Sequence, residues 1–169
     1  MNIIKKLQSS RGVSLSEMLL AMLILSLTIS FIGGGVMVIK HAYDTITLRA
    51  EARTLLSTVI LSVSSELQQG ANVAEEAGDG ASRLSFYSYK HGCRVYIENK
   101  NSNIYMITVA GQQELPLLTD KTITKGLIPK VTNITYENQV FSCTISIYYN
   151  DEVYETQQIY VRPINADRQ

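Results

Sequence analysis

The chain opens with a long apolar stretch and then changes character. No residue between Glu17 and Lys40 is charged, which leaves the 22 residues Met18–Ile39 for an apolar segment. As a helix rising ~1.5 Å per residue, this segment would measure roughly 33 Å, enough to cross a bilayer. Residues 1–12 carry three basic side chains and no acidic one. Positive charge before an apolar span predicts that this leader stays cytoplasmic and that the remainder is exported.

Beyond the span, apolar residues recur at spacings of three and four. The set is Leu48, Ala52, Leu55, Leu56, Val59, Ile60, Val63 and Leu67. Such spacing forms one stripe along an α-helix, and Gly70 is a stop signal after it. The pattern therefore predicts one helix from about Val13 to about Gln69. Residues 13–39 would be apolar on nearly all sides, whereas residues 40–69 would need a sheet to cover one face.

From residue 70 onward, polar and apolar residues tend to alternate, as they do in β-strands. Strands are predicted at 84–89, 93–98, 104–109, 131–136, 140–149 and 153–161. The short stretch 115–118 contains Pro116 and is expected at an edge or in a loop. The segment Ala71–Ala81 is expected to be a linker or solvated loop, because its three acids match no calcium-loop spacing. One long helix followed by antiparallel strands predicts an α+β fold, with residues 70–169 as its head.

Charge and motif content exclude several classes of function. Lysine plus arginine balance aspartate plus glutamate at 15 each, so no strong global field recruits nucleic acid. Lys121, Lys125 and Lys130 are too scattered to establish a DNA-binding patch. The two histidines, His41 and His91, lie in no metal-type spacing, and no catalytic or nucleotide-binding motif occurs. We therefore predict no enzyme activity, no metal and no cofactor.

The two cysteines, Cys93 and Cys143, share the alternation of the apolar residues around them, so both are expected to face an apolar surface. A buried free thiol is a common state for cysteine. In an exported protein a disulfide between them is equally open, and it would stabilise the fold by roughly 4 kcal/mol in the chain-entropy model. The sequence does not choose between these two states.

Three consecutive glycines, Gly33, Gly34 and Gly35, lie in the later part of the apolar span. Each costs about 1 kcal/mol in helix propensity relative to alanine. One interpretation is close packing of helices through small residues, which is common in membranes. The other is a weak point at which the helix melts locally when the chain leaves the membrane. The second interpretation predicts a gap in the helix within an assembled filament and a kinked or continuous helix in an isolated subunit.

The segment Arg11–Leu19, RGVSLSEML, resembles the processing site of type IV prepilins and of the pseudopilins of type II secretion. The resemblance implies that a prepilin peptidase cuts between Gly12 and Val13 on the cytoplasmic face. It also implies that the new N-terminus is N-methylated and that Glu17 occupies the family's glutamate position. Val13 stands where the family usually begins with Phe or Met, which argues mildly against a major pilin.

The chemistry of Glu17 fits this resemblance. Cleavage creates a positive amine on Val13, one helical turn from the Glu17 carboxylate. Charges in an apolar medium require partners. The amine of one subunit and Glu17 of its neighbour can neutralise each other within a helical bundle. This pairing predicts that Glu17 sets the register of assembly.

The later part of the chain is similar in pattern and spacing to minor pilins and pseudopilins of the J/W type. The matching parts are Ile128–Tyr136 (IPKVTNITY) and a following hairpin that ends near Val161–Asn165. The resemblance implies a minor subunit near a filament tip that helps to prime assembly. Its expected partners are the prepilin peptidase, other pilin or pseudopilin subunits, the inner membrane and the assembly platform.

The expected location follows from the same resemblance. The protein would be a single-pass membrane protein with an extracytoplasmic head before assembly, and part of a filament afterwards. Three alternatives remain open: a major pilin, a DNA-receptor pilin, and a membrane-anchored extracellular binding module or enzyme with no filament role. A DNA receptor would require salt-sensitive binding by the head. A simple anchor would tolerate changes at Gly12 and Glu17, whereas a prepilin would not.

Overall fold

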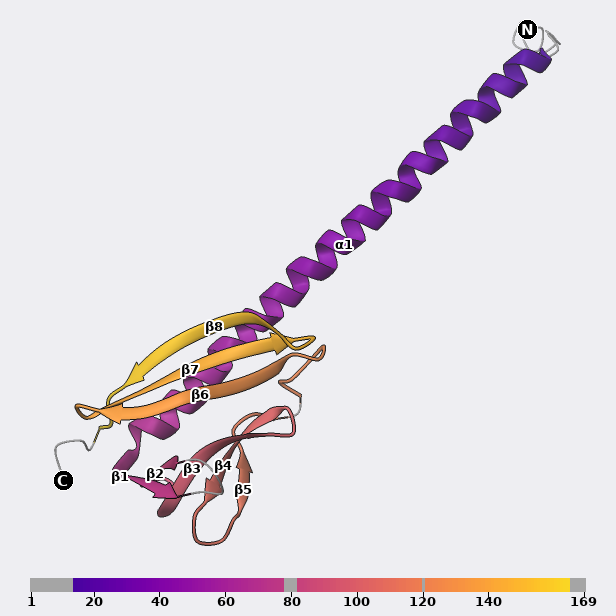
Figure 1. Ribbon diagram of the computed structural model, residues 1–169. Coiled ribbons are helices and arrows are strands. Elements are labelled where there is room, and N and C mark those ends of the chain that lie inside the picture. The colour runs from indigo at the N-terminus through magenta and orange to yellow at the C-terminus, as the bar shows by residue number, and fades with distance from the viewer. Residues whose placement is uncertain (1–13, 78–81, 120, 165–169) are drawn as a thin grey trace, which may run out of the picture. The chain divides into compact units, whose positions relative to one another are not determined.

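The computed structural model describes residues 14–77, 82–119 and 121–164 (Figure 1). The chain divides into two compact units, Met1–Ile46 and Thr47–Gln169. Helix α1 (Leu15–Gln68) contributes its first part to the first unit and its last part to the second. The second unit, called the head below, also holds the eight strands found in the described residues.

The long predicted helix is confirmed. Helix α1 ends at Gln68, one residue before the expected end, because Gly70 begins the first strand. It runs without interruption through Gly33–Gly35. The predicted stripe is also confirmed, since the buried apolar residues of α1 are Ala52, Leu55, Val59, Val63 and Leu67. The remaining stripe members, Leu48, Leu56 and Ile60, are partly buried against the same core.

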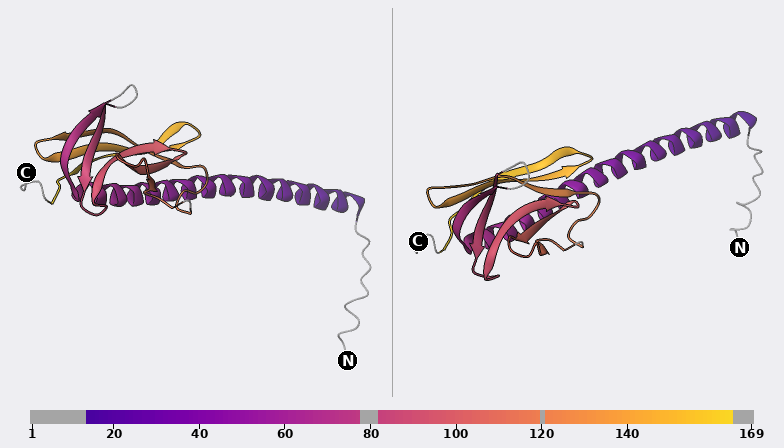
Figure 2. Two further views of the ribbon diagram at one scale, coloured as in Figure 1. Left: turned by 90° about the horizontal axis from the view of Figure 1, so that it is seen from below. Right: turned by 60° about the horizontal axis from the view of Figure 1, so that its bottom comes forward.

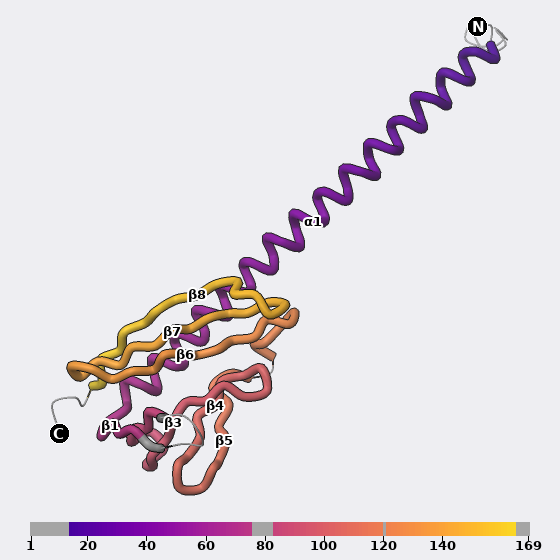
Figure 3. Tube along the Cα trace, viewed as in Figure 1, coloured from indigo at the N-terminus to yellow at the C-terminus, as the bar shows by residue number. Residues whose placement is uncertain are grey.

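The strands of the head divide between two antiparallel sheets, which Figure 3 shows as separate groups in the Cα trace. The first sheet contains, in chain order, β1 (Gly70–Ala77), β2 (Ser82–Ser88), β3 (Cys93–Lys100), β4 (Asn103–Thr108) and β5 (Glu114–Pro116). The second contains β6 (Ile128–Glu137), β7 (Val140–Tyr149) and β8 (Glu152–Val161). This arrangement confirms the α+β fold. The edge position expected for the stretch around Pro116 is confirmed as well.

The prediction of a linker over Ala71–Ala81 is wrong for Ala71–Ala77. These residues form β1, which pairs with β2 from Gly70 opposite Ser88 to Ala77 opposite Ser82. Alanine, glycine and glutamate have a weak intrinsic preference for strands, and pairing with a neighbour overrides that preference. A bulge between Ala71 and Ala74 marks the irregular point. The rest of the expected loop lies outside the described residues.

The core of the head lies between the last part of α1 and the inner faces of both sheets. Figure 2 shows this part of α1 running along the strands. The largest fully buried side chains come from α1 and both sheets, and they include Phe86, Ile104, Met106, Phe141, Ile145 and Ile147. The rings of Phe86 on β2 and Phe141 on β7 meet edge to face, with centroids 5.7 Å apart. One apolar core therefore holds the helix and the two sheets together.

A side-chain amide also joins the two sheets. The Nδ2 group of Asn99 on β3 donates to the carbonyl of Val131 on β6 at 2.7 Å. The Val131 amide donates in return to Oδ1 of Asn99 at 2.8 Å. Asn99 thus occupies the backbone groups of Val131 as a neighbouring strand would, and this reciprocal contact protects part of the β6 edge.

Candidate functional site at the start of helix α1

The predicted processing site lies just before the part of the chain that the structure describes. Gly12 and Val13 are outside the described residues, which begin at Ser14. Cleavage between Gly12 and Val13 therefore stays a prediction. The structure places the next element of the site, Glu17, in the first turn of α1.

The Glu17 carboxylate caps the helix that carries it. The backbone N–H of Ser14 donates to Oε2 of Glu17 at 3.0 Å, and the Glu17 N–H donates to the Ser14 carbonyl at 2.9 Å. A glutamate three residues after the N-cap that accepts the N-cap amide is one half of a capping box. Negative charge here is also favoured by the helix dipole. The Ser14-x-x-Glu17 spacing carried this signal in the sequence, and our sequence analysis missed it.

This geometry changes the argument for Glu17. A carboxylate at the edge of an apolar span requires a partner, and the Ser14 amide supplies one inside the same helix. The bond holds the carboxylate at the N-terminal end of α1. Glu17 itself is exposed. Its contact with a neighbouring subunit stays a prediction.

The segment after Glu17 is long enough and apolar enough to cross a membrane. The residues of its most apolar stretch are not buried against other parts of the described structure. Its few hydroxyl groups are satisfied inside the helix. Ser26, Thr28 and Ser30 donate to the carbonyls of Leu23, Ile24 and Ser26, respectively. Such internal bonding suits a helix surrounded by lipid, where water is not available as a partner.

The three glycines of the span face open space. No atom of the described residues lies within 4 Å of a Cβ built on Gly33, Gly34 or Gly35, apart from the neighbouring helix backbone. No contact within the described chain therefore requires glycine at these positions. The continuous helix agrees with what was expected of an isolated subunit under the weak-point interpretation, and it fits close helix packing equally well. Both interpretations stay open.

Cys93, at the start of β3, and Cys143, on β7, are both free thiols in the structure. Both contact the apolar core, which confirms the predicted orientation. Cys143 is only 1% exposed, and burial raises the pKa of its thiol to about 11. Because the thiolate is the reactive form, Cys143 is poorly suited to nucleophilic chemistry.

We expect alkylation to distinguish the two cysteines. At neutral pH, N-ethylmaleimide should modify Cys143 at least tenfold more slowly in the folded protein than in urea, because its thiol is buried and protonated. Its rate should rise as the pH approaches 11. Intact mass before and after denaturation counts the modified thiols, and a Cys143→Ser variant assigns them. Rapid modification of Cys143 in the folded protein would contradict the buried position.

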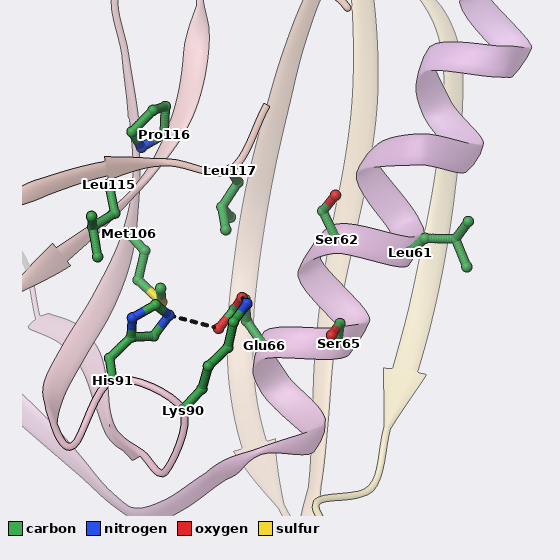
Figure 4. A pocket seen from close by; sticks show the side chains of 10 residues that line it. All are labelled: Leu61, Ser62, Ser65, Glu66, Lys90, His91, Met106, Leu115, Pro116 and Leu117. Atoms are coloured by element: carbon green, nitrogen blue, oxygen red, sulfur yellow. Dashed lines mark hydrogen bonds and ion pairs between the residues drawn. The ribbon is translucent and has the colours of Figure 1, made fainter. Parts of the chain in front are cut away.

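A second feature, in the head, was not expected from the sequence. A cavity of about 520 Å³ lies between the end of α1, the turn after β2, and the β4 and β5 strands (Figure 4). Glu66, Lys90 and His91 supply its charged or titratable side chains. The only feature of the sequence that pointed to this cavity is the position of Glu66 at the border of the apolar stripe of α1. No group of three or more potential metal ligands occurs in the described part of the chain.

Comparisons with known proteins identified no relative of this chain. No protein-family model, curated protein or solved structure matches this chain. Its functional assignment therefore depends on its own residues and geometry.

Proposed function

We propose that this protein is a minor pilin or pseudopilin, a structural subunit that prepilin peptidase processes and that enters a filament of the type IV pilus or type II secretion class. The observation that carries the proposal is the position of Glu17. It lies between a basic leader and an uncharged span, and its carboxylate is held at the N-terminal end of α1. A position near the filament tip, where the subunit primes assembly, is part of the same proposal.

The first step of the proposed mechanism is cleavage after Gly12. It removes the basic leader and leaves a charged amine on Val13, directly before Ser14 in the chain. The Ser14 amide that Glu17 accepts survives cleavage, because it belongs to the peptide bond between Val13 and Ser14. Glu17 can therefore keep its bond to this amide after cleavage. This local arrangement presents a positive and a negative group at one end of an apolar helix.

The second step is assembly. A carboxylate in a helix centre within a bilayer costs about 2.5–3.5 kcal/mol on insertion scales, and less near the interface. Pairing with the amine of an adjacent subunit offsets this cost. Because one such pair fixes the axial position of two neighbouring helices, Glu17 would select the register of the filament. The apolar side chains after Glu17 are exposed in the single chain and would pack against neighbouring helices.

The head supports this function by its construction. Its sheets cover the apolar stripe of α1 from Ala52 to Leu67, so that this part of the helix has its own core. The side chains of the preceding part, Leu15–Ile46, are exposed. A helix divided in this way suits a subunit that has a membrane or filament segment and an extracytoplasmic head. The proposed partners are prepilin peptidase, other pilin-like subunits and the assembly platform of the inner membrane.

We expect Glu17→Ala to leave leader removal intact and to lower incorporation into filaments roughly thirtyfold or more. Loss of one partner from a buried charge pair costs about 2 kcal/mol or more, which corresponds to that factor. The measurement is the amount of the tagged subunit in sheared filaments, relative to its amount in membranes. Normal incorporation of Glu17→Ala would contradict the assembly role.

A second variant separates charge from capping. Glu17→Gln removes the charge, but its amide oxygen can still accept the Ser14 N–H. The proposal predicts that Glu17→Gln fails to assemble as Glu17→Ala does. If Glu17→Gln assembles normally while Glu17→Ala does not, helix capping carries the effect and charge pairing is wrong. Glu51→Gln, at a half-buried position of the same helix within the head, is the matched control and should assemble normally.

A further inference from the structure

We draw no further inference here: the strongest candidate, the outer edge of strand β8 (Glu152–Val161) with its exposed side chains Val153 and Tyr160, pairs with no strand of the described residues, but nothing in the structure shows what covers it.

Discussion

Replacing Phe141 with alanine is expected to lower the free energy of unfolding of the head by about 3–5 kcal/mol. Phe141 is 0% exposed and lies on β7, on the face of the sheet that meets the core. Its ring contacts Phe86 of the other sheet and also Tyr136 of β6, with a centroid distance of 4.6 Å to the latter. Its removal would therefore leave a cavity where the two sheets meet, and would remove two aromatic contacts as well.

Urea denaturation followed by tyrosine fluorescence measures this effect. Every tyrosine except Tyr43 lies in the head, and the chain contains no tryptophan. Tyr160 on the neighbouring strand is 69% exposed and faces away from the core, since it pairs with Ser142 rather than with Phe141. Tyr160→Ala is the matched control and should change the free energy by less than about 0.5 kcal/mol. A loss below about 1 kcal/mol for Phe141→Ala would show that the sheets do not depend on this contact.

The elements that could be predicted from the sequence are those with strong local patterns. The helix was predictable because an uncharged apolar run and a regular stripe both have helical character over many residues. The hairpin of β7 and β8 was predictable for a similar reason, since alternating residues flank Asn150 and Asp151, which both adopt positive φ in the turn. In each case, neighbouring residues along the chain determine the structure.

Features that depend on distant residues were not predictable. Strand β1 has little intrinsic tendency to be a strand, and its pairing with β2 determines its conformation. The hydrogen bonds that join the two sheets connect Asn99 to Val131, which are 32 residues apart in the sequence. No periodicity reveals such a contact, because a single amide side chain supplies the bonds that a strand would otherwise supply.

The same distinction applies to the two sites. Glu17 was identified from its place before the apolar span. Its capping bond could also have been predicted from the Ser14-x-x-Glu17 spacing in the sequence. Glu66 borders the stripe of α1, but its contacts come from Lys90 and His91 in a turn more than 20 residues later. Only the folded head brings these three side chains together. The cavity beside them therefore had no signal in the sequence beyond an acidic residue next to an apolar face.

The second large effect concerns the leader. In prepilins, which residues Arg11–Leu19 resemble, a glycine precedes the cleaved bond. Under the proposed function, Gly12→Ala should abolish leader removal, because the resemblance implies that the peptidase cuts after a glycine. Gly34→Ala makes the same chemical change in the span, where no described atom lies within 4 Å of the added Cβ except the adjacent helix backbone. This control should be cleaved as efficiently as the wild type.

The central claim is tested most directly by the intact mass of the membrane-extracted protein after co-expression with a prepilin peptidase. We expect the wild type and Gly34→Ala to lose Met1–Gly12, with one added methyl group when the new amine is methylated, and Gly12→Ala to keep its leader. A wild-type chain that retains its leader, or that is cut well after the apolar span, would contradict the account. The protein would then be an anchored or secreted domain with no place in a filament.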